Sequence, residues 1–118
     1  MELLTAQDRA RLLANGQLRR QAETETPNLN VLPVVKLFTP DADCTWLLTE
    51  LDPEDTDRAF GLCDLGLGFP ELGYVSLAAL STLRGRLNLP VERDRHFAAA
   101  RTLSAYAAEA RASKSVTA

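Results

Sequence analysis

Carboxylates crowd the middle of the chain, and they are the residues best suited to do chemistry. Between residues 41 and 71 there are nine acidic residues against one basic residue. Within this stretch Glu50 and Asp52 follow Trp46, and Asp64 or Glu71 could join them as oxygen ligands for Mg²⁺ or Ca²⁺. A metal-dependent phosphodiester hydrolase uses a comparable set of carboxylates around its ions. The alternative interpretation is a solvated acidic turn, because Asp, Glu and Pro are ordinary turn residues.

His96 is the one histidine of the chain, and Asp94 precedes it by two residues. In an extended segment these side chains share a face, so the carboxylate could orient the imidazole for acid–base chemistry. A nucleophile is also needed, and no activating context is recognisable at Ser76, Ser81, Cys44 or Cys63. We therefore predict no catalytic residue and no cofactor, and we favour a protein that is not an enzyme. If a metal is bound after all, its predicted ligands are Glu50, Asp52, Asp94 and His96.

The run Glu92-Arg93-Asp94-Arg95 alternates in sign, so an extended chain carries its acids on one side and its arginines on the other. We interpret it as an ion-pair lock, in which Arg93 bridges to Glu50 or Asp52 and fastens this segment to the sheet. A bidentate arginine–carboxylate pair suits that role. The functional alternative makes Arg93 and Arg95 phosphate ligands.

The formal net charge of −3 hides an uneven distribution of charge. Residues 1–40 carry +1, residues 41–71 carry −8 and residues 72–118 carry +4. Such an acidic centre indicates a protein partner with a basic surface, for which carboxylates act as phosphate surrogates. The predicted acidic interaction surface consists of Glu50, Asp52, Glu54, Asp55, Asp57, Asp64 and Glu71.

Nucleic acid is a weaker alternative as a partner. Trp46, Phe60 and Tyr74 could stack on bases, but their neighbours are acidic, so we expect core aromatics and no nucleic acid on the sheet face. The basic C-terminal third offers the other possibility, through the arginines Arg84, Arg86, Arg93, Arg95 and Arg101.

Three strands position these residues. β-branched and aromatic residues predict a strand at Val34–Phe38, and alternation at a period of two predicts strands at Thr45–Glu50 and Arg58–Leu65. Pro53 favours a turn between the last two, and neighbouring runs joined by short polar loops pair as antiparallel strands. We therefore predict an α+β fold with a three-stranded antiparallel meander. A fourth strand is added if Val91–Phe97 is extended.

The alternation also assigns faces within Thr45–Glu50. Trp46, Leu48 and Glu50 are predicted on one face, and Leu47 lies on the other. A meander of three strands needs helices across it to be stable.

Helices are predicted in three places. Thr5 is predicted to cap a helix over Ala6–Ala14, and the Asp8 side chain is predicted to accept a hydrogen bond from the Thr5 amide in return. Asn15-Gly16 is predicted to end this helix. Ser76 caps a helix over Leu77–Arg84, which is the candidate cover for the sheet and ends at Gly85. An alanine-rich helix at about Ala98–Ala112 has a narrow apolar stripe, so we expect it to dock weakly.

The chain is expected to form one domain over residues 1–112, with a polar loop at 17–30 and a disordered tail at 113–118. Its 118 residues, 46% of them hydrophobic, suffice for one core without metals or disulfides. There is no long apolar run and no signal peptide, so we expect a cytoplasmic protein that does not contact the membrane. Cys44 and Cys63 are then expected to be reduced. The alternative is a disulfide between them, because pairing of the second and third strands could bring the two residues close together.

Several spaced motifs occur in an order that resembles the bacterial family of domain of unknown function 2958. They are Thr45-Trp46 with Thr49-Glu50 and Asp52, Phe60-Gly61-Leu62, Glu71-Leu72-Gly73-Tyr74 with Ser76-Leu77, and Val91-Glu92-Arg93-Asp94 with Phe97. The likeness runs from Leu3 to about Phe97, and the polar segment before Val31 and the tail after Phe97 depart from it. The resemblance implies an accessory protein of plasmids and other mobile elements, and no reaction or catalytic residue.

We therefore expect a small non-enzymatic protein-interaction module that uses its acidic surface, in an anti-defence or modulating role. The alternative is a metal-dependent phosphodiester hydrolase. The oligomeric state is left open by these residues.

Overall fold

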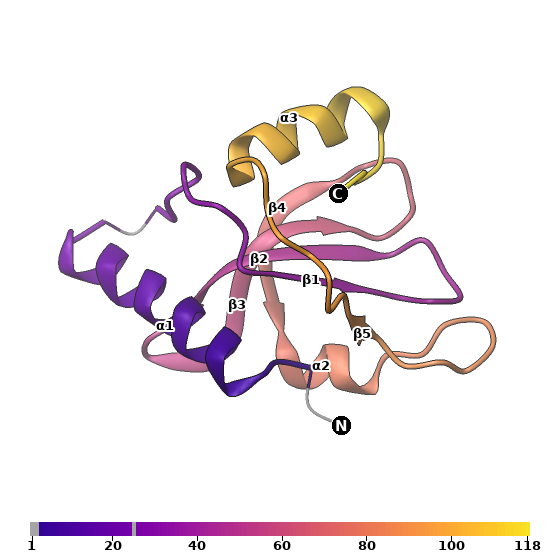
Figure 1. Ribbon diagram of the computed structural model, residues 1–118, viewed down its shortest axis with the longest axis horizontal. Coiled ribbons are helices and arrows are strands. Elements are labelled where there is room, and N and C mark those ends of the chain that lie inside the picture. The colour runs from indigo at the N-terminus through magenta and orange to yellow at the C-terminus, as the bar shows by residue number, and fades with distance from the viewer. Residues whose placement is uncertain (1–2, 25) are drawn as a thin grey trace.

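A five-stranded antiparallel sheet forms the centre of the fold, with strand order β4-β3-β2-β1-β5 (Figure 1). The computed structural model describes residues 3–24 and 26–118. The strands are β1 (Val35–Phe38), β2 (Thr45–Asp52), β3 (Asp55–Asp64), β4 (Glu71–Ser76) and β5 (Glu92–Arg93), and the helices are α1 (Ala6–Gln21), α2 (Leu77–Thr82) and α3 (Leu103–Ser113). The predicted α+β class is confirmed, and the sheet is larger than the three or four strands expected.

The predicted meander is present as β1, β2 and β3. The turn Pro53-Glu54 joins β2 to β3, and Asp52 Oδ1 accepts a hydrogen bond from the Glu54 amide at 2.9 Å. The additional strands form the two edges: β4 pairs with β3, and the two-residue β5 pairs with Leu37 and Phe38 of β1. These edges are hard to predict because short strands carry little periodic signal.

A register shift in β2 corrects the predicted faces of that strand. Leu48 pairs with Gly61 and Glu50 with Phe60, which leaves Thr49 as an extra residue in β2. Because one inserted residue reverses the alternation that follows it, Leu51 joins Trp46 and Leu48 in the core, and Glu50 does not. The buried hydroxyl of Thr49 donates a hydrogen bond to the Phe60 carbonyl at 3.4 Å.

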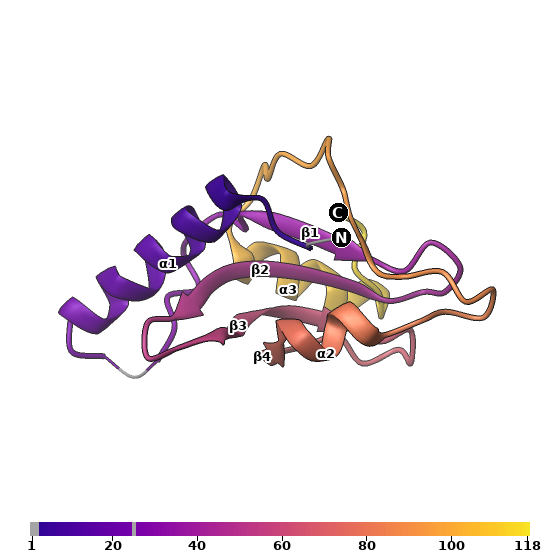
Figure 2. The ribbon, with the colours of Figure 1, turned by 90° about the horizontal axis from the view of Figure 1, so that it is seen from below.

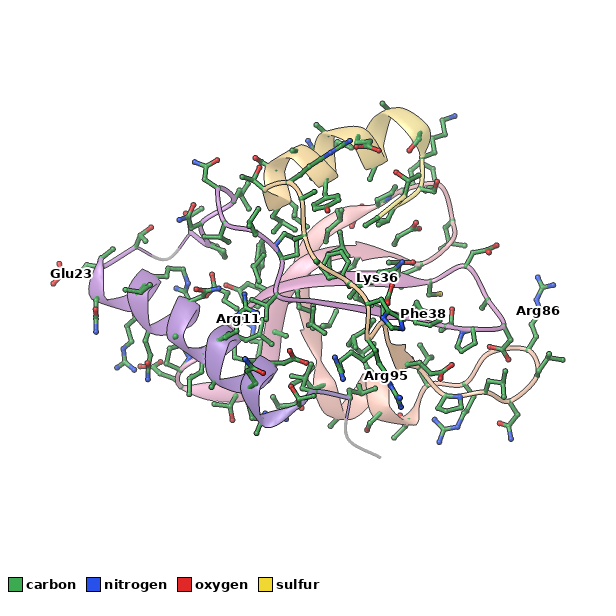
Figure 3. All side chains as sticks on the ribbon, viewed as in Figure 1. Arg11, Glu23, Lys36, Phe38, Arg86 and Arg95 are labelled. Carbon is green, nitrogen blue, oxygen red and sulfur yellow. The ribbon has the colours of Figure 1, made fainter. Side chains whose placement is uncertain are left out.

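Helix α1 is longer than predicted. Thr5 and Asp8 form the expected capping box, but the helix continues through Gly16 to Gln21, so the predicted end at Asn15-Gly16 is wrong, as is the loop at residues 17–21. Gly16 is buried because α1 crosses β2 there, and a Cβ at this position would overlap the carbonyl oxygen of Leu51. Ala22 caps the helix, and its amide donates a hydrogen bond to the Leu18 carbonyl at 3.1 Å. Glu23 follows with φ 56°, and it lies at the far end of α1 (Figure 3).

Helix α2 begins as predicted and ends early. The Ser76 side chain accepts a hydrogen bond from the Ala79 amide at 3.1 Å. The last helical residue is Thr82, and Leu83 is extended, so Gly85 does not end the helix. Gly85 instead lies against the Asp41 carboxylate, where a Cβ would not fit.

The two faces of the sheet carry separate cores. One core joins α1 and α2 to the sheet through Leu12, Trp46, Leu48 and Leu80, among others. Figure 2 places α2 in front of the strands and α3 behind them.

The second core lies under α3. Leu103, Ala107 and Ala110 are buried against Leu47 and Leu62. The narrow apolar stripe of α3 is thus buried on the sheet, and its small alanine side chains allow a close approach.

The segment after α3, predicted as a disordered tail, contacts the sheet. The Val116 amide donates to Asp64 Oδ2 at 2.9 Å, and Lys36 Nζ donates to the Ala118 carbonyl at 2.7 Å. Within the described residues, no helix combines the length and the apolar character needed to cross a bilayer.

Substitution of Gly16 tests the crossing of α1 over β2. Gly16→Ala should lower the free energy of unfolding by about 1–3 kcal/mol through overpacking, whereas at an open helical position the same change adds about 1 kcal/mol of stability. Gly73→Ala is the control, because nothing lies within 4 Å of a Cβ placed there. Urea unfolding of both variants measures the difference. A stabilised Gly16→Ala variant would contradict the close crossing.

Candidate functional site

The structure divides the predicted acidic surface. Glu50 and Asp64 are buried, with 4% and 3% of their surface exposed, so neither is available to a partner. Asp64 accepts hydrogen bonds from the Gly66 and Val116 amides at 2.8 and 2.9 Å. These two residues must be removed from the predicted surface. The reason is that strand alternation and the register shift turn both side chains inward.

The exposed carboxylates lie at opposite ends of β3. Glu54, Asp55 and Asp57 surround the turn between β2 and β3, and Glu71 lies at the far end of that strand, where it pairs with Cys63. The exposed part of the predicted acidic surface is therefore divided between the two ends of this strand.

Arginines pair with two of the four carboxylates around the β2–β3 turn. Asp52 Oδ2 lies 3.7 Å from Arg58 Nη1, and Glu54 Oε1 lies 3.0 Å from Arg20 Nη2. The Arg58 guanidinium also stacks over the Tyr74 ring at 3.7 Å. Asp52 and Glu54 therefore have arginine partners, whereas no arginine or lysine among the described residues pairs with the exposed Asp55 or Glu71.

Asp57 has a structural role at α2. Its carboxylate accepts a hydrogen bond from the Ser76 hydroxyl at 2.6 Å and one from the Ala78 amide at 2.8 Å. The Ser76 hydrogen bond, followed by the Ala78 amide, lowers the pKa of Asp57 below its ordinary value. The charged carboxylate therefore fastens the start of α2 to β3.

The predicted ion pair of Arg93 with Glu50 or Asp52 is not formed, and these residues have other partners. Arg19 Nε donates to Glu50 Oε2 at 2.6 Å, and Arg93 Nε lies 3.6 Å from Asp8 Oδ2. Arg93 cannot reach Glu50, because it is level with Trp46, roughly 13 Å along the strand direction from Glu50. The hydrogen bond to Glu50 raises the pKa of Arg19.

The predicted metal ligands are not brought together. Glu50 and Asp52 end β2, whereas Asp94 and His96 follow β5 at the other edge of the sheet. Asp94 Oδ1 accepts the backbone amide of His96 at 2.9 Å in a turn, so the two side chains do not share an extended face. Among residues 3–24 and 26–118, no three His, Cys, Asp or Glu side chains are grouped as a metal site requires.

The two cysteines are free, and both pack partly buried against the core of α1 and α2. Burial, followed by the nearby charge of Glu71, raises the pKa of the Cys63 thiol to about 11. Cys63 is therefore protonated at neutral pH and poorly suited to nucleophilic chemistry.

The basic C-terminal third does not present all five of its arginines freely. Arg93 pairs with Asp8, and Arg101 pairs with Glu109. Arg86 points away from the molecule at the tip of the loop that follows α2 (Figure 3). Trp46 and Phe60 are buried, as predicted for core aromatics, and Phe60 contacts Tyr74 edge to face at 5.1 Å.

A cavity beside the Arg19–Glu50 pair was not predicted. It has a volume of ≈ 330 Å³ and lies between the end of α1, β2 and the segment that joins α1 to β1. Its lining includes Leu18, Ala22 and Val31 together with Asn15 and the ion pair. The sequence pattern does not predict it, because Arg19 falls within residues 17–30, which have the composition of a polar loop. Continuing the helical spacing past Gly16 would have aligned Arg19 with Asn15 and Leu12.

A second unpredicted feature is a group of exposed apolar side chains on the loops at one end of the sheet. We call this the loop end, and it comprises residues 39–44, 65–70 and 83–90. Its most exposed members are Phe69 (78%), Leu87 (74%) and Leu67 (73%), and Leu65, Leu83 and Leu89 are also exposed. The sequence could have indicated these exposed side chains, because apolar residues alternate with glycines in the turn-forming stretch Leu65-Gly66-Leu67-Gly68-Phe69.

Comparison with known proteins identifies one relationship. The family model described as "Protein of unknown function (DUF2958)" matches residues 3–117. The resemblance inferred from the motifs is thus confirmed, over a longer stretch than those motifs cover. No curated protein and no solved structure matches the chain.

A mutant cycle tests the buried pair. Arg19→Met leaves a buried carboxylate without its partner and should cost about 3–5 kcal/mol of stability, whereas the double variant Arg19→Met/Glu50→Leu should cost less than this single change. The control cycle uses Arg20→Ala and Glu54→Ala, whose side chains are 60% and 71% exposed, and its coupling should stay within about 1 kcal/mol. Equal couplings in the two cycles would show that the Arg19–Glu50 pair is not buried.

The pH dependence of stability tests the role of Asp57. Its pKa is lower in the folded protein than the value of about 3.9 in an unfolded chain, so its contribution is complete above the unfolded value and is lost as the pH falls through the folded value. Asp57→Asn should therefore be less stable than the wild type at neutral pH, and this difference should vanish in acid. Ser76→Ala should weaken that pH dependence. A difference that is constant with pH would contradict the assignment.

Proposed function

Because the chain belongs to the DUF2958 family, whose function is described as unknown, we propose a function from its own side chains. It acts as a non-enzymatic interaction module that binds a partner protein in the cytoplasm. The partner presents an apolar face, which packs on the loop end. Exposure of Phe69, Leu67 and Leu87 is the observation that carries this proposal.

The loop end is a structured surface. Asp41 Oδ2 accepts hydrogen bonds from the Leu87 and Leu89 amides at 2.5 and 3.3 Å, which ties the turn between β1 and β2 to the loop after α2. On its other side this turn meets the β3–β4 loop, since Gly66 lies against Asp43. Both views of the ribbon place the three loops together at one end of the sheet (Figures 1 and 2). Loops held in this way keep their apolar side chains exposed in a fixed arrangement.

Contiguous exposed apolar groups with a charged surround are typical of protein-binding surfaces. Leu83, Leu87 and Leu89 are accompanied by the exposed arginines Arg84 and Arg86. On the loop between β3 and β4, Phe69 lines a depression together with Glu71 and Arg111. An exposed aromatic residue beside an arginine matches the residue types that are enriched in interface cores.

The loop end supports an interaction role better than the acidic residues do. Around the β2–β3 turn, Asp52 and Glu54 pair with arginines and Asp57 caps α2, so fewer of the carboxylates there are free to attract a basic partner. An apolar contact needs no such charge. The mobile-element setting implied by the motif resemblance suggests a host protein as the partner, with modulation of that protein as the outcome.

Matched surface variants distinguish the two surfaces. Affinity capture from host cells with the full tagged chain should recover a partner, and Leu67→Ser/Phe69→Ser should reduce its recovery by about tenfold or more, as expected for hot-spot residues. Leu18→Ser removes a leucine that is 64% exposed and lies far from the loop end, so it should retain the partner. Glu54→Gln/Asp55→Asn should also retain it.

The outcomes separate clearly. Loss of the partner with Glu54→Gln/Asp55→Asn, and not with the apolar variant, would overturn the proposal in favour of the acidic surface. Sedimentation of the purified protein measures self-association, and a dimer that dissociates in Leu67→Ser/Phe69→Ser would assign the loop end to a second copy of the chain. Because all these residues are exposed, urea unfolding should change by no more than about 0.5 kcal/mol.

A further inference from the structure

The cavity beside Arg19 and Glu50 has the size and make-up of a small-molecule site. Its volume of ≈ 330 Å³ lies within the range of protein ligand pockets, about 300–1,000 Å³. Leu18, Ala22 and Val31 supply its apolar walls, and the other seven lining residues are polar or charged, Asn15 and the Arg19–Glu50 pair among them. We propose that this cavity binds a small neutral ring that carries an N–H donor beside a C=O acceptor, as a lactam or a nucleobase does. This proposal does not depend on the loop end.

The polar side of the cavity is fixed before any ligand arrives. Arg19 Nε donates to Glu50 Oε2 at 2.6 Å, and Arg19 Nη1 donates to the Thr24 carbonyl at 3.2 Å. Asn15 Nδ2 is held by the Thr49 carbonyl at 2.9 Å. A site whose side chains are already oriented spends less free energy on ordering when it binds.

The hydrogen-bonding capacity that is left defines the ligand. Glu50 Oε1 accepts no hydrogen bond from residues 3–24 or 26–118, so the cavity offers a carboxylate acceptor. The Arg19 guanidinium has further N–H donors beyond those that contact Glu50 and Thr24. A ligand therefore needs a donor for Glu50 and an acceptor for Arg19 on neighbouring atoms.

The charge of the site selects a neutral ligand. Glu50 and Arg19 compensate each other, so the polar side of the cavity has no net charge. An anion or a cation would lose its hydration without meeting an uncompensated opposite charge, which is costly in an apolar cavity. A neutral ring edge makes hydrogen bonds to both charged groups and avoids that cost.

NMR titration of the full chain tests this assignment with defined probes. Caprolactam and uracil present the proposed edge, uridine adds a sugar to the base, and benzoate and benzamidine are charged rings of similar size. We expect uracil or caprolactam to bind at least about tenfold more tightly than either charged ring, since hydrogen bonds to charged groups are stronger than those between neutral groups. Binding of uridine would identify a nucleoside as the ligand, and its exclusion would limit the site to the free ring.

Two helix variants locate the binding. Ala22 is exposed and lines the cavity, so Ala22→Trp fills the site without touching the ion pair, whereas Ala14 is exposed on the same helix outside the lining. Ala22→Trp should weaken binding of the neutral probes by about tenfold or more, and Ala14→Trp should leave it unchanged. Glu50→Gln gives the site a net positive charge, so the variant should gain affinity for benzoate.

Three results would overturn the proposal. They are the absence of binding by all neutral probes, equal weakening by Ala22→Trp and Ala14→Trp, and binding of benzoate or benzamidine to the wild type as tightly as uracil. If Glu50→Gln fails to fold, the two tryptophan variants still decide the question.

Discussion

The contact of Gly16 with the Leu51 carbonyl is the constraint on which the rest of this architecture depends. Only a residue without a side chain lets α1 cross β2 at this distance, and the crossing carries the helix one further turn. That turn places Arg19 on Glu50, and it forms one wall of the cavity beside the pair. A helix that stopped at Gly16 would leave Glu50 buried without a counter-charge, which is a costly state.

The same turn of α1 explains how an acidic segment is accommodated next to a core. Arg19 and Arg20 come from the last turn of the helix, where basic side chains also interact favourably with the helix dipole, and they meet Glu50 and Glu54. Part of the uneven charge along the sequence is therefore paired locally in three dimensions. Most of the large exposed apolar side chains lie on the loops at the opposite end of the sheet.

Local rules predicted the parts of this fold that depend on local interactions. The meander, the turn at Pro53 and the caps at Thr5 and Ser76 follow from neighbouring residues alone, and each is present. The failures involve contacts between distant residues. Asn15-Gly16 resembles a helix end, and only the Leu51 carbonyl explains why glycine is needed inside the helix. The extra residue at Thr49, which turns Glu50 off the face of Trp46, has no signature in the residues of β2 themselves. The predicted partner of Arg93 is wrong because the order of the strands decides which residues lie side by side, and this order is not evident from local sequence.

Amide hydrogen exchange of residues 17–21 tests most directly whether α1 continues past Gly16. The account predicts slow exchange there, comparable to that of the preceding turn around Leu12, because these amides are hydrogen-bonded within a helix held against β2. Exchange at the rate of an unfolded chain from residue 17 onward, with protection confined to the residues before Gly16, would contradict it. The ion pair, the cavity and the crossing would then all have to be abandoned together.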